Sequence, residues 1–177
     1  MRNINAPNAL SLARLSLIPV AVCFLLRERF LPAAATVAFC GLLDILDGAA
    51  ARRFSQETAL GKLLDPLADK LLCAALFITL AAIGRIPSWF AGCVIARDAL
   101  ISLAALIIYK KHGFQTISTA AGKAAFIVLI LAAVTAILFE DHIKPALVLS
   151  CMAMAGSLLS YALTYRYYLR QGAVKAA

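Results

Sequence analysis

Acidic residues are scarce in this chain, where nine Asp and Glu stand against 17 Lys and Arg. Hydrophobic residues make up 63% of its 177 residues and the mean hydropathy is +0.90, whereas soluble domains are about 45–50% apolar. Such a chain cannot cover its apolar surface in water. We therefore expect an integral membrane protein, with the lipid bilayer as its solvent.

The chain also lacks the patterns of several other protein classes. Its net charge of +8 comes without a basic cluster interleaved with aromatics, so the expected partners are membrane lipids and not nucleic acid. No repeat, low-complexity tract or linker divides it, which predicts a single domain over residues 1–177. Five cysteines lie in apolar stretches without a Cys-x-x-Cys pair or clustered histidines, which argues against disulfides and a zinc site: Cys23, Cys40, Cys73, Cys93 and Cys151.

Six apolar segments predict an all-α bundle of six transmembrane helices. A membrane-spanning helix needs about 20 mostly apolar residues, and the segments are approximately 8–26, 32–51, 60–82, 87–110, 118–139 and 145–168. We expect the first segment to be retained and not cleaved as a signal peptide, because Asn8 and Arg14 interrupt its apolar run. Basic residues favour the cytoplasmic side, and they are more numerous at the end that holds both termini. Both termini are therefore expected to be cytoplasmic.

Four carboxylates flank the connection between the second and third segments. Asp44 and Asp47 are three residues apart, and Asp65 and Asp69 are four apart, so each pair shares one face of its helix. A charge inside the membrane costs about 2.5–3.5 kcal/mol on insertion scales and marks a functional candidate. Because the connection is short, we expect the two helices to be antiparallel neighbours, with all four carboxylates facing one cavity.

Hard divalent cations such as Mg²⁺ prefer oxygen ligands and would neutralise these carboxylates. A pair of such ions can hold a diphosphate and stabilise the attacking and leaving oxygens. Gly48, Ala51 and Gly61 leave room beside the carboxylates, and Arg52 suits a phosphate. The structural alternative is that the Asp side chains pair with Arg52, Lys62 or Lys70 and carry no metal.

The residues around these carboxylates resemble the CDP-alcohol phosphatidyltransferase motif, D-x2-D-G-x2-A-R-x8-G-x3-D-x3-D. All eight constrained positions are present, from Asp44 to Asp69. The opening Pro7-Asn8-Ala-Leu-Ser11-Leu-Ala-Arg14 is similar to the P-N-x-L-[ST]-x-x-R start of the same family. The resemblance covers essentially the whole chain.

The resemblance implies a homodimer of six-helix subunits in the bacterial cytoplasmic membrane, with its active site facing the cytoplasm. It implies two Mg²⁺ or Mn²⁺ ions held by Asp44, Asp47, Asp65 and Asp69, with Asp69 also the general base. It further implies that CDP-diacylglycerol is bound and that CMP is released. The residues implied for that binding are Asn8, Ser11, Gly48, Ala51, Arg52 and Gly61.

The acceptor alcohol is harder to assign, and two subgroups of the family fit. We expect glycerol 3-phosphate, which would give phosphatidylglycerophosphate. The alternative is phosphatidylglycerol, the acceptor of CMP-forming cardiolipin synthases, and Arg97-Asp98 resembles the Arg-Asp of that subgroup. Both subgroups usually show [GS]-K-x-x-T-x-x-Q in the fifth helix, whereas here Gly122-Lys123 is followed by Phe126 and Leu129.

Three cations inside apolar stretches are the acceptor-side candidates: Arg14, Arg97 and Lys123. An intramembrane cation needs a partner. A structural pair with Asp98 is the alternative for Arg97, and snorkelling to the interface is the alternative for Lys123.

Three rival classes remain. An ion or proton carrier would typically show inverted repeats, and a membrane prenyltransferase has Asp-rich motifs of different spacing. An inactive structural homologue would not be expected to retain the whole motif.

Overall fold

A computed structural model describes residues 6–54, 59–112 and 119–175, with side chains described over 13–43, 69–107 and 119–166. All regular structure in these ranges is helical, which confirms the all-α prediction. The elements are α1 (Ala6–Leu26), α2 (Phe30–Phe54), α3 (Ala59–Ala82), α4 (Ser88–His112), α5 (Ala120–Leu138), the 3₁₀ turn η1 (Glu140–His142) and α6 (Ile143–Lys175).

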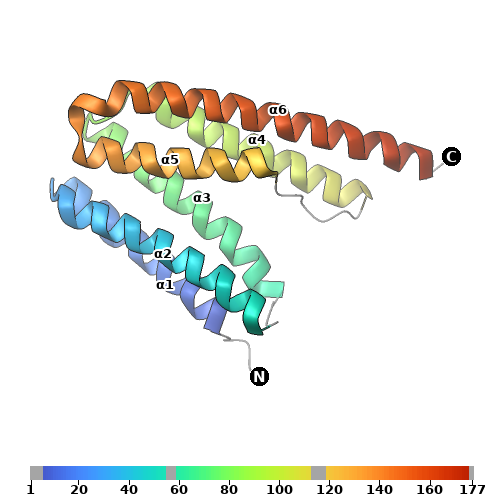
Figure 1. Cartoon of the computed structure of the whole chain (residues 1–177), viewed down its shortest axis with the longest axis horizontal. Coiled ribbons are helices and arrows are strands. Elements are labelled where there is room, and N and C mark those ends of the chain that lie inside the picture. Colours follow the sequence, from blue (N-terminus) through green and yellow to red (C-terminus); the bar gives the residue numbers. More distant parts are fainter. Residues whose placement is uncertain (1–5, 55–58, 113–118, 176–177) are drawn as a thin grey trace.

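Successive helices run in opposite directions (Figure 1). The C-terminal ends of α1, α3 and α5 gather at one end of the molecule, and α2, α4 and α6 return from there. The N-terminal end of α1 and the C-terminal end of α6 consequently lie away from that end. The cytoplasmic location of the two termini stays a prediction.

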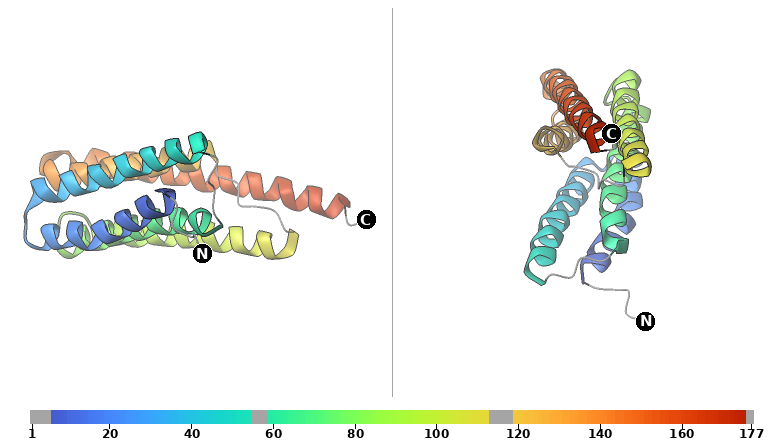
Figure 2. Two further views of the ribbon diagram at one scale, coloured as in Figure 1. Left: turned by 90° about the horizontal axis from the view of Figure 1, so that it is seen from below. Right: turned by 90° about the vertical axis from the view of Figure 1, so that its right-hand side faces the viewer.

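Helix α1 packs against both α2 and α3, which share no contact of their own among the described residues. In the end-on view of Figure 2, α2 lies apart from α3, and α1 lies beside α3. Helix α5 contacts α2 and α3 from another side and packs along α6, while α4 bridges α3 and α6. The expected direct pairing of α2 with α3 is therefore not seen in the described part, where α1 joins the two helices that carry the Asp motif.

Small, branched and aromatic apolar side chains from α1 to α6 fill the core, including Leu25, Val37, Leu76, Phe77 and Phe90. Other large apolar side chains point outward: Leu100, Leu103, Leu131, Val148 and Met152 are each at least half exposed. An apolar exterior of this kind is suited to lipid and not to water. A bilayer around the bundle therefore explains why apolar side chains lie both in the core and on the exterior.

Three described segments are long and apolar enough to span a membrane, namely Ser88–Ile107, Ala120–Leu138 and Glu140–Arg166. Two shorter apolar stretches, Ala13–Leu26 and Phe30–Leu43, belong to α1 and α2. The chain is therefore a helical membrane protein. The full set of six membrane spans stays a prediction.

Side-chain contacts join the connections at the end opposite the chain termini. The Arg85 Nη1 donates to the Glu140 Oε2 at 3.0 Å, and the Arg85 guanidinium lies 4.1 Å from the centre of the Phe30 ring. Helix α3 ends at Ala82, and the φ of 75° at Gly84 just beyond it allows the Arg85 N–H to reach the Leu80 carbonyl at 2.9 Å. These contacts join the connection between α3 and α4 to the start of α2 and to η1, which precedes α6.

Candidate functional site

The Asp motif occupies the two helices that α1 joins. Asp44 and Asp47 lie in α2, and Asp65 and Asp69 lie in α3. Because the backbone is helical at both pairs, their three- and four-residue spacings place each pair on one helix face. The side chains of three of the four fall outside the described residues, as do those of Asn8, Ser11, Gly48, Ala51, Arg52 and Gly61.

The metal site therefore stays a prediction. Among the described side chains, no group of three or more His, Cys, Asp or Glu could hold a metal ion. That region contains only Asp69 of the four expected ligands. The chemistry of the predicted set fits the expected ions, since four carboxylates and no sulfur or imidazole ligand suit a hard cation such as Mg²⁺ or Mn²⁺.

Asp69 forms an ion pair with Arg14, across from α3 to α1. The Arg14 Nη1 lies 2.7 Å from the Asp69 Oδ1, and the Arg14 side chain is only 1% exposed while that of Asp69 is 31% exposed. The guanidinium is thus enclosed by the bundle, and the carboxylate remains accessible. The structure brings these two predicted site residues together, although it does not test the acceptor role expected for Arg14.

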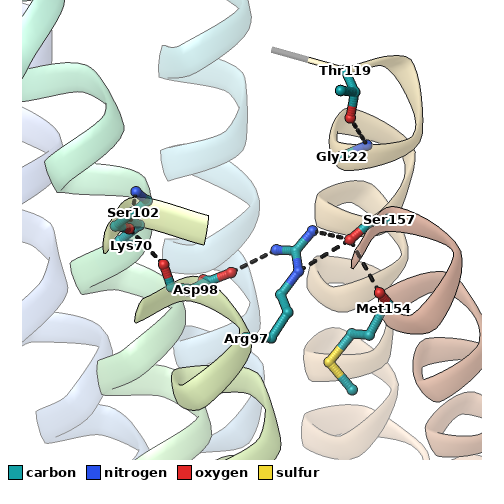
Figure 3. A network of polar contacts seen from close by, with 8 residues as sticks. All are labelled: Lys70, Arg97, Asp98, Ser102, Thr119, Gly122, Met154 and Ser157. Atoms are coloured by element: carbon teal, nitrogen blue, oxygen red, sulfur yellow. Dashed lines mark hydrogen bonds and ion pairs between the residues drawn. The ribbon is translucent and has the colours of Figure 1, made fainter. Parts of the chain in front are cut away.

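Arg97 is held on two sides in the interior (Figure 3). Its Nη1 lies 2.5 Å from the Asp98 Oδ1, and its Nε and Nη2 donate to the Ser157 Oγ of α6 at 3.2 and 2.6 Å. The structural alternative considered for Arg97, a pair with Asp98, is therefore present. A guanidinium has five N–H donors, so these contacts still leave N–H groups with which Arg97 could bind an anion.

Lys70 follows Asp69 on α3 and points toward α4. Its Nζ donates to the Ser102 Oγ at 2.5 Å, and that hydroxyl donates to the Asp98 carbonyl (Figure 3). Polar contacts therefore link the Asp69 region of α3 to the α4 residues next to Arg97.

Lys123, the third acceptor candidate, is exposed one turn into α5. The Thr119 hydroxyl caps this helix by accepting a hydrogen bond from the Gly122 N–H at 3.0 Å. Tyr161 of α6 packs directly on Gly122, since a Cβ placed there would lie 2.5 Å from the tyrosine oxygen. Lys123 therefore emerges beside a close contact between α5 and α6.

Sequence reasoning missed Ser157 and Ser102 and did not assign Tyr161 a contact. Ser157 is 1% exposed and lies 60 residues from Arg97, so no local pattern joins them. Ser150, on the same helix, is equally buried but donates only to the Ala146 carbonyl within that helix. For the contact between Gly122 and Tyr161 the sequence offered one signal, the glycine itself, because a residue without a side chain permits close helix packing.

The chain is similar to known enzymes of two kinds, cardiolipin synthases and a CDP-diacylglycerol--glycerol-3-phosphate 3-phosphatidyltransferase. The chain is 41% identical over 107 residues to the cardiolipin synthase (CMP-forming) of Rattus norvegicus, covering 60% of this chain and 35% of that protein. It is 37% identical over 109 residues to the CDP-diacylglycerol--glycerol-3-phosphate 3-phosphatidyltransferase of Aquifex aeolicus, covering 60% of this chain and 61% of that protein. A Streptomyces coelicolor cardiolipin synthase (CMP-forming) is 35% identical over 119 residues, 64% of this chain and 55% of that protein.

These alignments leave more than a third of each relative uncovered. The sequence profile of the CDP-alcohol phosphatidyltransferase family, in contrast, matches residues 4–164, which include the Asp motif, Arg14, Arg97 and Lys123. That match extends over most of the 177 residues. The chain belongs to the CDP-alcohol phosphatidyltransferase family.

Proposed function

We propose that this protein transfers the phosphatidyl group of CDP-diacylglycerol to the hydroxyl of an alcohol and releases CMP in phospholipid biosynthesis. The observation that carries this proposal is the complete Asp motif on α2 and α3, within the range matched by the family profile. The names of the relatives support it, because they describe transfer to glycerol 3-phosphate or the CMP-forming synthesis of cardiolipin.

In the proposed reaction the acceptor oxygen forms a bond to the phosphorus that carries the diacylglycerol. The bond from that phosphorus to the oxygen of CMP breaks, and the electron pair leaves with CMP. Asp69 takes the proton of the acceptor hydroxyl, since a carboxylate in hydrogen-bond reach can act as a general base. Its 31% exposure in the described structure is compatible with that contact.

The four Asp residues are proposed to hold two Mg²⁺ or Mn²⁺ ions. Such ions, when bound, would neutralise the diphosphate and the charge that develops on CMP. The chain's own contribution is to bind and orient the CDP group. The residues proposed for this are Asn8, Ser11, Gly48, Ala51, Arg52 and Gly61.

Glycerol 3-phosphate is the acceptor we propose first. Its phosphate needs cations near the metals, and Arg97 and Lys123 are the proposed contacts. Arg97 is favoured by its N–H groups beyond those that contact Asp98 and Ser157. Lys123 is favoured by its exposed position close to the packed start of α5.

Phosphatidylglycerol is the second candidate acceptor, and the Arg97–Asp98 pair is the observation that favours it. The pair is intact in the structure at 2.5 Å, and this Arg-Asp resembles the dipeptide of cardiolipin synthases. Cardiolipin synthases are also among the relatives. For either acceptor we propose a homodimer in a bacterial cytoplasmic membrane, with the active site facing the cytoplasm.

A panel of acceptors tests the proposal. Purified protein would receive CDP-diacylglycerol, Mg²⁺ and either glycerol 3-phosphate or phosphatidylglycerol, and the lipid product would be identified by mass spectrometry. We expect phosphatidylglycerophosphate in the first reaction and CMP release that stops with a chelator. Cardiolipin in the second reaction alone would select the alternative acceptor. No CMP release with any alcohol would reject the proposed function, and ion flux in liposomes would then indicate a carrier.

A further inference from the structure

Arg14 has a position that its assignment to the acceptor does not explain. It lies on α1, the helix that contacts both α2 and α3 (Figures 1 and 2). Its guanidinium is bonded to Asp69 of α3 and lies within electrostatic reach of Cys40 of α2. Arg14 is therefore located where α1 joins the two helices that carry the Asp motif.

Burial separates the two members of this ion pair. Arg14 is 1% exposed, whereas Asp69 is 31% exposed. An acceptor entering the site can reach the carboxylate, but contact with the guanidinium would require the surrounding helices to move. The geometry thus suits a residue that acts on Asp69 and not one that binds the acceptor phosphate.

The other described ion pairs differ from this one in their exposure or in the elements that they join. Arg85 and Glu140 meet near the surface, where Glu140 is 75% exposed, and Arg97 and Asp98 are neighbours on one helix. The pair of Arg14 and Asp69 joins two packed helices, and its cation is only 1% exposed, against 18% for Arg85. A charge-assisted bond of 2.7 Å to a rigidly enclosed guanidinium restricts the rotamer of the carboxylate.

We propose that Arg14 is a positioning residue that holds the Asp69 carboxylate in the orientation from which it receives the acceptor proton. This inference rests on the proposed phosphatidyl transfer. Misplacing a reacting group by about 1 Å can lower a rate by about 10². Loss of the Arg14 contact should accordingly slow turnover while leaving substrate binding near its original strength.

The main variant is Arg14→Met, which keeps a long apolar side chain and removes the charge. We expect kcat to fall about 10- to 100-fold, while the acceptor KM and the metal-dependent Kd for CDP-diacylglycerol change less than about threefold, as expected when a transition-state contact is lost. Arg14→Lys, which retains a cation, should recover part of kcat. Arg85→Met removes an arginine from an ion pair at the other end of the bundle and should leave kcat unchanged.

A double variant distinguishes positioning from a general structural role. If Arg14 acts through Asp69, adding Arg14→Met to Asp69→Asn should lower kcat less than about threefold further, because residues that act as a unit are not additive. A purely structural contribution would lower kcat in both backgrounds.

Several outcomes would overturn the proposal without touching the proposed function. They are an unchanged kcat in Arg14→Met, a raised acceptor KM with normal kcat, an additive loss in the double variant, and failure of all Arg14 variants to fold when Asp69→Asn folds. Absence of CMP release by the unsubstituted protein would instead reject the function on which the inference rests.

Discussion

Ser157→Ala is the substitution that should most clearly test how much the buried polar contacts contribute to the stability of the bundle. The Ser157 hydroxyl accepts two hydrogen bonds from Arg97, at 3.2 and 2.6 Å, and both residues are buried. Ser157→Ala removes this one acceptor oxygen and leaves two N–H groups of a buried guanidinium without their α6 partner. Hydrogen bonds to charged groups contribute about 1.5–3 kcal/mol each, although interhelical bonds measured in membranes average about 0.6 kcal/mol.

Two factors place the expected loss between these limits. The Asp98 ion pair survives and continues to neutralise Arg97. The two lost bonds share one oxygen, so they do not add fully. We therefore expect Ser157→Ala to lower the free energy of unfolding by about 2 kcal/mol.

Ser150→Ala is the matched control on the same helix. Ser150 is as buried as Ser157, but its hydroxyl donates to the Ala146 carbonyl, which already belongs to the helix. Its replacement should change the free energy of unfolding by less than about 0.5 kcal/mol. Helical circular dichroism during SDS titration of protein in mixed micelles would measure both variants. Equal losses in the two would refute the reasoning, since the Arg97 contact would then contribute nothing of its own.

Three further predictions concern the site. Asp69→Asn should lower the rate of CMP release by about 10²–10⁴, the range of general acid–base catalysis, with CDP-diacylglycerol binding retained, whereas Asp44→Asn should weaken that binding; equal loss of binding in both would reject Asp69 as the base. Lys123→Ala should raise the KM for glycerol 3-phosphate more than that for CDP-diacylglycerol in steady-state assays, and an unchanged acceptor KM would remove Lys123 from the site. Gly122→Ala should lower the free energy of unfolding by about 1–3 kcal/mol through overpacking, because its Cβ would lie 2.5 Å from the Tyr161 oxygen; pairing it with Tyr161→Ala should recover part of the loss, and additive losses would contradict the contact.

The helices were predictable because apolar runs and prolines leave local marks in the sequence. The expected third segment, 60–82, agrees with α3 at Ala59–Ala82, and the first, 8–26, agrees with α1 at Ala6–Leu26. Two starts were placed slightly late. Pro32 and Pro145 were taken as the first residues of their helices, but α2 begins at Phe30 and α6 at Ile143. Proline needs no N–H partner within the first helical turn, so the helix can start before it.

Which helices pack against one another was harder to predict from the sequence. A short connection suggested that the second and third segments would pair directly, but α1 contacts both in the described part of the chain. Sequence spacing orders residues within a helix and says little about which helix lies between two others. Small residues such as Ala21 and Ala33, which are fully buried, allow backbones to approach, but their positions in the sequence do not say which helix they will face.

For the candidate site, too, the sequence identified individual residues but not their distant partners. Intramembrane charge identified Asp69, Arg14 and Arg97 as residues that need partners, because an unpaired charge there is costly. The partners themselves could not be assigned where they are far away in sequence, as for Arg14 with Asp69 and Arg97 with Ser157. Asp98 was the exception, since it directly follows Arg97 and the pair could be proposed from adjacency alone.

The most direct test of the account is the release of CMP from CDP-diacylglycerol by the purified protein, measured with and without glycerol 3-phosphate, in Mg²⁺ and after chelation. The account predicts CMP release that requires both the alcohol and the divalent ion, and that falls by about 10²–10⁴ in Asp69→Asn. CMP release that proceeds equally without an alcohol acceptor, or without any divalent ion, or at full rate in Asp69→Asn, would contradict the account.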